Sequence, residues 1–493
     1  MKLTAAVVLV ATSLSLGASC SSKRQPEGPD AGNAPDASSG GEGGAQGGVG
    51  ARSSGRANGA AGSPAGSGGS APEYPLKLGP SGAQYLVDQK GRPFFWAGEA
   101  AWSLIVQLSL EDARAYLDDR QDKGVNVLMV NLVENKFASN APANRAGHRP
   151  FGSKPFTEFN EAYFAHVDAV LREAGARGIM VLLAPAYLGY GCGDEGFCFD
   201  VKRTSGAEMR AWGRYLGERY GSFPNLMWLI GGDADPTPVQ GKLSELVSGI
   251  RERDSAHLMS AHNAPESFAT SHWQNASWLT VNNVYTYQQA AYAWALDARK
   301  EGKPFFLAES TYENEHDASP QALRAQAYWA ILSGAMGHIF GNCPLWHFDS
   351  STKFCDSRGW RSQLNSPGSK SMQFLRKLFT SRAWQDLVPD ADHSTLTAGF
   401  GEEGEADYAA GALTVDRETF IAYLPSARQI TVDLTRLSGT QVSVTWFDPA
   451  QGTAQGKSTL AGKKTVTLSP PRAGDWVLIL DDSARGFAAP GSK

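Results

Sequence analysis

The sequence predicts an α/β fold, a (β/α)8 TIM barrel over residues 72–385 followed by a small antiparallel β-sandwich over residues 390–483. From Pro72 to about Arg382, eight short apolar runs alternate with helical periods. Apolar strands that each lead into an amphipathic helix are typical of a parallel sheet covered by helices, and eight units favour a closed barrel over an open doubly wound sheet. After about Asp390 the runs become short and alternating, which favours a sandwich.

Length and charge narrow the classes of protein that fit. The chain has 493 residues, which is too long for one ordinary core and predicts a large domain with at least one smaller one. Its apolar content of 42% suits globular cores, and its net charge is −5. The sequence has no basic stripe with interleaved aromatic residues, so nucleic acid is not an expected partner.

The first 20 residues have the pattern of a secretory signal peptide. Lys2 precedes an apolar stretch from about Ala5 to Leu16, and small residues follow up to Cys20. The stretch is too short to span a bilayer. One interpretation is cleavage after Ser19 by ordinary signal peptidase. The segment also resembles a bacterial lipoprotein signal, in which Cys20 is lipidated, although Leu16 stands four residues before the cysteine instead of three.

The next segment predicts a tether. Residues 21–71 are rich in Gly, Ser and Ala without an apolar period, so we expect a disordered linker. A globular body on such a linker predicts a bacterial lipoprotein at the outer membrane or cell surface, and otherwise a periplasmic or secreted protein. The membrane is then a partner through the N-terminal lipid anchor, and we expect a monomer. Residues 484–493 form a short tail.

The remaining cysteines form two local pairs. Cys192 and Cys198 lie in GCGDEGFC, and Cys343 and Cys355 lie in NCPLWHFDSSTKFC. In an oxidising compartment each pair can close a short loop. A zinc site is the competing interpretation, but the spacings are not those of a zinc knuckle and no His pair flanks them. Free, partly buried thiols are the third. We expect two disulfides.

The elements of the barrel can be assigned in order. The strand-like runs are FFWAGEA (94–100), VNVLMVNL (125–132), IMVLLAPA (179–186), LMWLIGGD (226–233), HLMSAHN (257–263), WLTVNNVY (278–285), FFLAES (305–310) and HIFGN (338–342). Ser109 with Asp112 makes a capping-box pattern, and Ser319 before Pro320 predicts another helix start. A helix over about 160–176 presents one apolar face, made of Phe164, Val167, Val170 and Leu171. Neither GxGxxG nor a P-loop follows the first strand, which disfavours a nucleotide-binding fold.

Polar residues follow these strands at their C-terminal ends, where such barrels carry their active sites. The stretch WLIGGDADP leads from the buried fourth strand into Asp233, and the seventh strand leads into Glu309. Strands four and seven lie nearly opposite each other around a barrel mouth, so the two carboxyls can face each other across the cavity. The other candidates, expected to bind substrate, are Glu99, Trp102, Asn131, Tyr187, His262, Asn263, Tyr285, Tyr287 and Trp346.

Two opposed carboxyls fit glycoside hydrolysis, in which they flank the scissile bond as a proton donor and a nucleophile. One has to stay protonated while the other is ionised, and mutual repulsion with unequal burial can produce that difference. Aromatic rings around the mouth suit sugars, which have apolar faces and hydroxyl edges.

Each candidate also has a structural interpretation. Asp235, which precedes a proline and a helical stretch, fits an N-cap better than the catalytic acid. Asp233 could cap a loop, and Glu309 could belong to a structural ion pair. His262 and Asn263 could satisfy backbone groups at the barrel rim. Several aromatic residues could be ordinary packing, namely Trp102, Tyr187, Tyr190, Trp273, Trp346 and Trp360.

The predicted barrel resembles the apiosidase-like glycoside hydrolases of clan A over essentially its whole length. The segments that carry the resemblance are PLKLGPSGAQYLVDQKGRPFFWAGEAAW, GHRPF, NLMWLIGGDADP, HLMSAHNAP, PFFLAES and GHIFGN. It implies Asp233 as general acid/base and Glu309 as nucleophile, with no cofactor and no metal. Most clan members carry Asn-Glu at the end of strand four, whereas this chain has Gly232 and Asp233. The apiosidase-like group has Gly-Asp there too. GEAAW departs from the GDTAW of that group, which leaves the role of Glu99 open.

The region after Asp390 contains seven short strand-like runs, LTAGFG, DYAAGAL, TFIAYLP, QITVDL, QVSVTWFDP, KTVTLSPP and DWVLIL. Of these, YLP, WFDP and DWVLIL resemble the small C-terminal domain that accompanies these barrels and is sometimes labelled collagen-binding. We expect Tyr423, Trp446 and Trp476 to serve core or interdomain packing. The domain is then a brace on the barrel.

These features predict an exported glycoside hydrolase that cleaves an oligo- or polysaccharide of plant or microbial origin by a retaining double displacement. Glu309 attacks the anomeric carbon while Asp233 protonates the leaving oxygen and then activates water. We expect Tyr285 to hold Glu309 by a hydrogen bond, with Tyr287 as the alternative. Two other functions remain open, a non-catalytic carbohydrate-binding surface lipoprotein and an adhesin led by the C-terminal domain.

Overall fold

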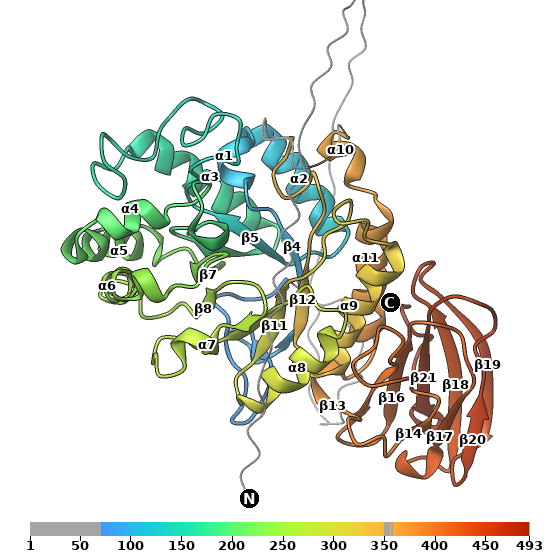
Figure 1. Cartoon of the computed structure of the whole chain (residues 1–493). Coiled ribbons are helices and arrows are strands. Elements are labelled where there is room, and N and C mark those ends of the chain that lie inside the picture. Colours follow the sequence, from blue (N-terminus) through green and yellow to red (C-terminus); the bar gives the residue numbers. More distant parts are fainter. Residues whose placement is uncertain (1–70, 350–354, 356–357, 493) are drawn as a thin grey trace, which may run out of the picture. The chain divides into compact units, whose positions relative to one another are not determined.

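The structure is a computed structural model that describes residues 71–349, 355 and 358–492 (Figure 1). The expected signal peptide over residues 1–20, its Cys20 and the linker up to residue 70 lie outside the described residues. Within the described part, no helix is long and apolar enough to cross a membrane.

Eight parallel strands form the barrel. They are β4 (Trp96–Ala100), β5 (Val127–Asn131), β6 (Met180–Ala184), β7 (Leu226–Gly231), β8 (Met259–His262), β10 (Asn282–Tyr285), β11 (Phe305–Glu309) and β12 (Gly337–Phe340). The sheet order is β8-β7-β6-β5-β4-β12-β11-β10-β9, where β9 (Ser267–Phe268) is a short antiparallel addition to β10. Across the gap between β8 and β10, the amides of Thr280 and Val281 donate to the carbonyl of Met259 at 3.1 and 3.2 Å. The barrel predicted from the sequence is confirmed, and each run of apolar residues overlaps one barrel strand.

These runs become strands because both faces of the sheet are buried. Every residue of β5, β6, β7 and β11 is buried. On β4 and β11, which are separated by β12, the rings of Trp96 and Phe306 stack at 4.4 Å and 18°. Rings that meet across an intervening strand have to lie inside the barrel. Alternate residues therefore fill the interior, and the others contact the surrounding helices.

Helices surround the strands in the expected alternation. The longer ones are α2 (Leu110–Asp122), α3 (Glu161–Ala176), α5 (Gly206–Tyr220), α6 (Gln240–Arg251), α8 (Ala291–Lys300), α9 (Pro320–Leu332) and α11 (Pro367–Thr380). Short helices are α1 (Leu104–Gln107), α4 (Cys198–Arg203), α7 (Thr270–Trp273) and α10 (Trp360–Gln363). Ser109 and Ser319 cap α2 and α9, as predicted. The pattern at Ser109 forms only its first half, whereas Ser205 and Glu208 form a complete capping box at α5 that the sequence analysis missed.

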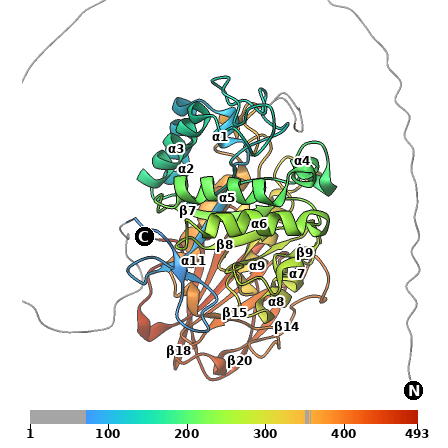
Figure 2. The ribbon, with the colours of Figure 1, turned by 90° about the vertical axis from the view of Figure 1, so that its left-hand side faces the viewer.

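Helices α5 and α6 lie side by side on the outside of the barrel (Figure 2). Glycines permit this close contact, because a Cβ added at Gly213 would lie 2.1 Å from the carbonyl oxygen of Leu246. A Cβ added at Gly249 would lie 2.1 Å from the carbonyl of Arg210. The two backbones are thus too close for any side chain at these positions.

The C-terminal region contains two antiparallel sheets. The larger has the order β13-β15-β16-β21-β18-β19, formed by β13 (Leu387–Pro389), β15 (Ala410–Thr414), β16 (Thr419–Leu424), β21 (Trp476–Asp482), β18 (Gln441–Asp448) and β19 (Thr453–Ala461). The smaller one comprises β14 (Leu396–Ala398), β17 (Ile430–Asp433) and β20 (Thr465–Leu468). Trp446 and Trp476 belong to the core between these sheets, which is the packing role expected for them. A further three-stranded sheet, β1 (Lys77–Leu78), β2 (Leu86–Val87) and β3 (Pro93–Phe94), precedes the barrel.

Polar and aromatic contacts join the barrel to the larger sheet. Tyr328 on α9 stacks on Tyr423 at 4.8 Å and 3°. Arg324 on the same helix donates two hydrogen bonds to Asp475, at 2.7 and 2.8 Å. The indole of Trp329 donates to the carbonyl of Tyr408 at 2.8 Å. Tyr423 therefore packs between domains, as expected.

Candidate functional site

The turn after β7 places Asp233 at the mouth of the barrel. Gly231 and Gly232 have φ values of +93° and +143°, and Asp233 itself has φ +52°. A Cβ added at Gly232 would lie 2.4 Å from Cδ2 of Tyr187. The two glycines thus allow the backbone to pass close to the Tyr187 ring. Asp233 follows in a left-handed backbone conformation, which is strained for any residue other than glycine.

The carboxylate of Asp233 has one strong partner. The hydroxyl of Tyr187 donates to Oδ2 at 2.5 Å. Oδ1 lies 3.7 Å from Nε2 of His262, is buried, and has no hydrogen bond among the described residues. The backbone carbonyl of Asp233 accepts a hydrogen bond from the amide of Gly191 at 2.9 Å. Gly191 lies next to the Cys192–Cys198 disulfide, so a covalently closed loop supports the position of Asp233.

Glu309 is the last residue of β11 and faces Asp233. Nε2 of His262 lies 3.1 Å from Oε2 of Glu309, and the hydroxyl of Tyr287 donates to Oε1 at 3.3 Å. One side-chain ligand atom from each of Asp233, His262 and Glu309 lies within 4.8 Å of the other two. The carboxyls predicted to face each other are therefore adjacent, with His262 in contact with both.

Burial changes the proton affinity of these groups. Burial, and next the charge of Asp233, raise the pKa of Glu309 to about 7, although the bond to His262 opposes the shift. Burial lowers the pKa of His262, but the hydrogen bond to Glu309 and the charges of both carboxylates reverse this and raise it overall. A carboxyl that can exchange a proton near neutrality is a common feature of catalytic sites.

Aromatic rings enclose the carboxyl pair. Tyr285 stacks on the imidazole of His262 at 4.9 Å and 17°, and Trp102 lies 5.7 Å from the same ring. Trp102 also contacts Tyr187 at 5.8 Å. Tyr287 is the most open ring, with 40% of its surface exposed. These rings offer flat apolar faces beside polar groups, the combination that sugar rings require.

Residues 80–386 match the family model described as apiosidase-like, catalytic domain. The chain belongs to the apiosidase-like family. It is accordingly a glycoside hydrolase. Residues 395–481 match a second model, described as putative collagen-binding domain of a collagenase.

Solved structures share the fold of this apiosidase-like chain. A glycoside hydrolase family 5 structure from Bacteroides vulgatus is 23% identical, with a TM-score of 0.75 over 85% of this chain and 96% of the other. A structure described as glycoside hydrolase is 22% identical, with a TM-score of 0.73 over 85% of this chain and 98% of the other. At these identities the similarity supports the fold. A comparison with curated protein sequences gives no match.

Glu99 does not lie in the mouth of this apiosidase-like barrel, contrary to the prediction. It is 1% exposed, and its carboxylate is bound by Tyr116 and Arg120 of α2, at 2.7 and 2.6 Å. Side chains alternate along a strand, so Trp96 in the interior places Glu99 on the helix side. The acidic residue of GEAAW therefore has a structural role.

Tyr285 does not hold Glu309, because the hydrogen bond comes from the alternative, Tyr287. The hydroxyl of Tyr285 lies 3.2 Å from that of Tyr287. Asn131 lies at the end of β5 and contacts Glu134 at 3.4 Å. The amide of Asn263 donates to the carbonyl of Phe268 at 2.7 Å, which is the rim-stabilising role considered for it.

Other candidates are structural. Asp235 accepts a hydrogen bond from the amide of Thr237 at 2.8 Å, at the start of the turn that leads into α6, as expected of a capping residue. Trp273 packs against Trp278 at 5.0 Å, and Trp360 packs against Phe348 at 5.6 Å.

The sequence analysis missed several residues of the site, all of which lie in loops. Phe137 contacts Tyr187 at 5.5 Å and Trp346 at 5.2 Å, which links two predicted substrate-binding rings. Glu315 accepts a hydrogen bond from the indole of Trp346 at 2.8 Å. Burial raises the pKa of Glu315. The sequence did contain a signal for Glu315, because it is a carboxylate only six residues after Glu309, in the loop that follows the seventh strand.

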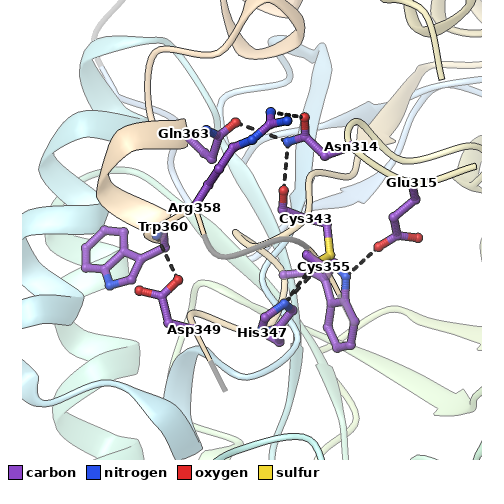
Figure 3. Close-up of a disulfide and its surroundings, with 10 residues drawn as sticks. Asn314, Glu315, Cys343, His347, Asp349, Cys355, Arg358, Trp360 and Gln363 are labelled. Atoms are coloured by element: carbon purple, nitrogen blue, oxygen red, sulfur yellow. Dashed lines mark hydrogen bonds between the residues drawn. A yellow bond between two sulfur atoms is a disulfide. The ribbon is translucent and has the colours of Figure 1, made fainter. Parts of the chain in front are cut away.

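Both predicted disulfides are present. Cys192 and Cys198 are joined, with Cα atoms 5.2 Å apart, and Cys343 and Cys355 are joined with Cα atoms 5.6 Å apart. Figure 3 shows the second bond with His347 beside it, and Nε2 of His347 lies 2.8 Å from Sγ of Cys355. The Cys343–Cys355 loop carries Trp346, so this bond also supports the barrel mouth.

Proposed function

We propose that the chain is a retaining glycoside hydrolase in which Glu309 is the nucleophile and Asp233 the general acid/base, acting on a plant or microbial polysaccharide. The observation that carries the proposal is the spacing of the two carboxyls, whose nearest oxygens lie within 4.8 Å. Retaining enzymes hold their carboxyls about 5–5.5 Å apart, whereas inverting enzymes leave about 6.5–9.5 Å for a water molecule. The observed spacing of these oxygens supports the retaining arrangement over the inverting one.

The roles of the two carboxyls follow from their surroundings. Glu309 has 7% of its side chain exposed, against 15% for Asp233. Glu309 is thus the deeper group, under the sugar whose anomeric carbon is attacked, while Asp233 is more accessible to a leaving group and to water. His262 and Tyr287 both contact Glu309, and hydrogen bonds donated to a carboxylate favour its ionised, nucleophilic form.

Double displacement needs one proton on the carboxyl pair. In the free enzyme, burial raises the pKa of Glu309 to about 7, so the proton resides there for part of the population near neutrality. As the glycosidic bond breaks, positive charge develops at the anomeric carbon and is stabilised by the Glu309 carboxylate, so the form that reacts carries its one proton on Asp233. Asp233 gives it to the leaving oxygen, and Glu309 forms the glycosyl bond. Asp233 next takes a proton from the water that releases the sugar.

The first experiment identifies a substrate by measuring sugar release from a panel of pectic, hemicellulosic and bacterial glycans. The configuration of the first product, followed by NMR, then tests the mechanism. Retention supports the proposal, whereas product of inverted configuration refutes the retaining mechanism and leaves glycoside hydrolysis standing.

Substitutions test the roles of the two carboxyls one at a time. Glu309→Ala should abolish turnover on all substrates. Asp233→Ala should retain activity on aryl glycosides whose leaving group needs no proton. Asp235→Ala is the matched control, because Asp235 is two residues away and 60% of its side chain is exposed. Full activity of Glu309→Ala would refute Glu309 as the nucleophile, whereas a wild type that releases no sugar from any glycan would favour the alternative assignment, a non-catalytic carbohydrate-binding surface lipoprotein or an adhesin.

The location of the enzyme is a separate part of the proposal. We propose that Cys20 is lipidated and that the linker over residues 21–71 holds the enzyme at a bacterial membrane surface. Support comes from the apolar segment before Cys20 and from the Gly/Ser/Ala-rich stretch after it. Cys20→Ser should move the protein from the membrane fraction to the soluble fraction. An unchanged distribution would refute the anchor.

A further inference from the structure

A cleft at the sandwich shares no residue with the barrel mouth. Its volume is about 340 Å³, within the range of about 300–1,000 Å³ that is usual for ligand pockets. Strands β18, β19 and β21 line it together with the C-terminal segment 486–490, and Arg382, which follows the last barrel helix, lies at one side. The cleft is thus at a domain boundary, a frequent position for ligand sites.

A strand irregularity shapes the wall of this cleft. On β18 and β19, Val444 pairs with Ser458 and Trp446 pairs with Gln455, so two residues of β19 stand opposite Thr445 alone. Gly456, one of the two, has φ +63°. This is a β-bulge, a feature that redirects side chains and is frequent beside functional sites.

Unpartnered polar groups face the cleft at the bulge. Thr445 lines it and is 5% exposed, yet its hydroxyl has no hydrogen-bond partner among the described residues. Gln455 and Lys457 also line the cleft from β19, and their side chains likewise have no partner within the described part of the chain. A hydroxyl that opens into a cleft from a residue as buried as Thr445 is well placed to bond a ligand.

The charges of the cleft cancel. Arg382 donates two hydrogen bonds to Asp481, at 3.0 and 2.8 Å, so this buried cation is neutralised by its partner. Lys457 and Asp482 add one further charge of each sign. An anionic polymer would meet no net positive field here, which disfavours pectate and nucleic acid.

The apolar part of the lining completes the match to a sugar. The ring of Phe487 lies at the cleft with Arg382 over it at 4.8 Å, and Ala488 and Pro490 line the same side. A neutral lining with hydroxyl and amide groups on one side and an aromatic ring on the other fits the edges and faces of a sugar. We propose that this cleft is a second glycan site, which binds a neutral segment of a polysaccharide while the barrel mouth cleaves elsewhere.

The test is native gel electrophoresis of the full chain through gels that contain a soluble polysaccharide. Arabinoxylan and galactomannan are the neutral probes, polygalacturonate is the anionic probe, and gelatin represents a protein ligand. Glu309→Gln is the parent, because it prevents hydrolysis during the run if the proposed mechanism holds. We expect at least one neutral polysaccharide to retard the parent.

Cleft variants then locate the binding. Gln455→Ala removes an exposed side chain that the fold does not need and should weaken retardation about five-fold, the effect of one hydrogen bond. Thr445→Val combined with Gln455→Ala and Phe487→Ala should reduce it to the retardation that the barrel mouth alone produces. Thr467→Val, an exposed threonine on β20 outside the cleft, is the matched control and should bind as the parent does.

The experiments distinguish a wrong assignment of the cleft from a wrong assignment of the enzymatic function. Retardation that is as strong in Gln455→Ala and in the triple variant as in the parent overturns the cleft, as does a parent that no neutral polysaccharide retards. Retardation by polygalacturonate or gelatin alone overturns the ligand class. In the background with Glu309 intact, the cleft variants should keep the wild-type kcat on an aryl glycoside. If no glycan is hydrolysed, the proposed function fails while the binding result stands.

Discussion

Buried carboxylates have different partners at the barrel mouth and at the boundary between the barrel and the sandwich. At the boundary, Asp475 and Asp481 each bind an arginine through two hydrogen bonds, with Arg324 and Arg382 as partners. At the mouth, the described residues give the carboxyl pair no arginine or lysine. A guanidinium partner favours the ionised form of a carboxylate, whereas burial without one raises the pKa, and for Glu309 burial outweighs the opposing effect of His262. The difference separates carboxylates that join the two domains from the pair that we propose as catalytic.

The largest expected effect on stability comes from breaking a pair at the boundary. Arg324→Ala leaves Asp475 buried without a cation, which should cost about 3–5 kcal/mol in the free energy of unfolding. Urea denaturation measures it. Lys300→Ala, which removes an exposed ion pair with Asp297, should cost less than about 1 kcal/mol and is the control. An equal loss of unfolding free energy in Arg324→Ala and Lys300→Ala would contradict a stabilising role for the buried pairs at the boundary.

Removing the unpaired carboxylate should have the opposite sign. The pKa of Glu309 is raised from 4.5 to about 7, so the folded state binds its proton more tightly than the unfolded state does. Stability from this group is present below about pH 4.5 and is lost as the pH rises to about 7, by up to about 3 kcal/mol. Glu309→Gln should therefore stabilise the fold at pH 8 and have little effect at pH 4.5.

Thermal unfolding of the wild type and Glu309→Gln at both pH values measures this difference. Burial also raises the pKa of Glu134 to about 7, so the wild type alone would mix two contributions. Subtracting the variant isolates Glu309. A variant that is less stable than the wild type at pH 8 would show that Glu309 is a structural group after all.

Burial and strand geometry explain which parts of the fold and of the site could be predicted from the sequence. The eight strands were predictable because strands buried on both faces are continuous apolar runs bounded by polar residues. Asp233 and Glu309 were predictable because the barrel fixes where its strands end. Glu99 was placed wrongly because the residue type was considered without the alternation of side chains, which puts it among Tyr116 and Arg120. Phe137 and Glu315 lie in loops, whose path no periodicity reveals.

A smaller effect should distinguish the two disulfides. Cys192→Ser with Cys198→Ser opens a short loop and should cost about 2 kcal/mol of stability. It should also lower kcat, because the amide of Gly191 holds the backbone of Asp233. Cys343→Ser with Cys355→Ser loosens the loop of Trp346 and should raise KM instead. Steady-state kinetics on the identified glycan measures both, and the same change in both variants would remove the distinction.

The smallest effect tests the hydrogen bond that Glu309 does have. Tyr287→Phe removes the donor at 3.3 Å from Oε1, a loss of about 1 kcal/mol, and should lower kcat about five-fold. It also removes a group that favours the ionised carboxylate, so the acid limb of the pH dependence of kcat/KM should move to higher pH. Tyr285→Phe is the matched control, since its hydroxyl lies 3.2 Å from that of Tyr287 and no bond joins it to Glu309. If Tyr285→Phe moved the acid limb further than Tyr287→Phe, Tyr285 would be the residue that controls the charge of Glu309, as the sequence first predicted.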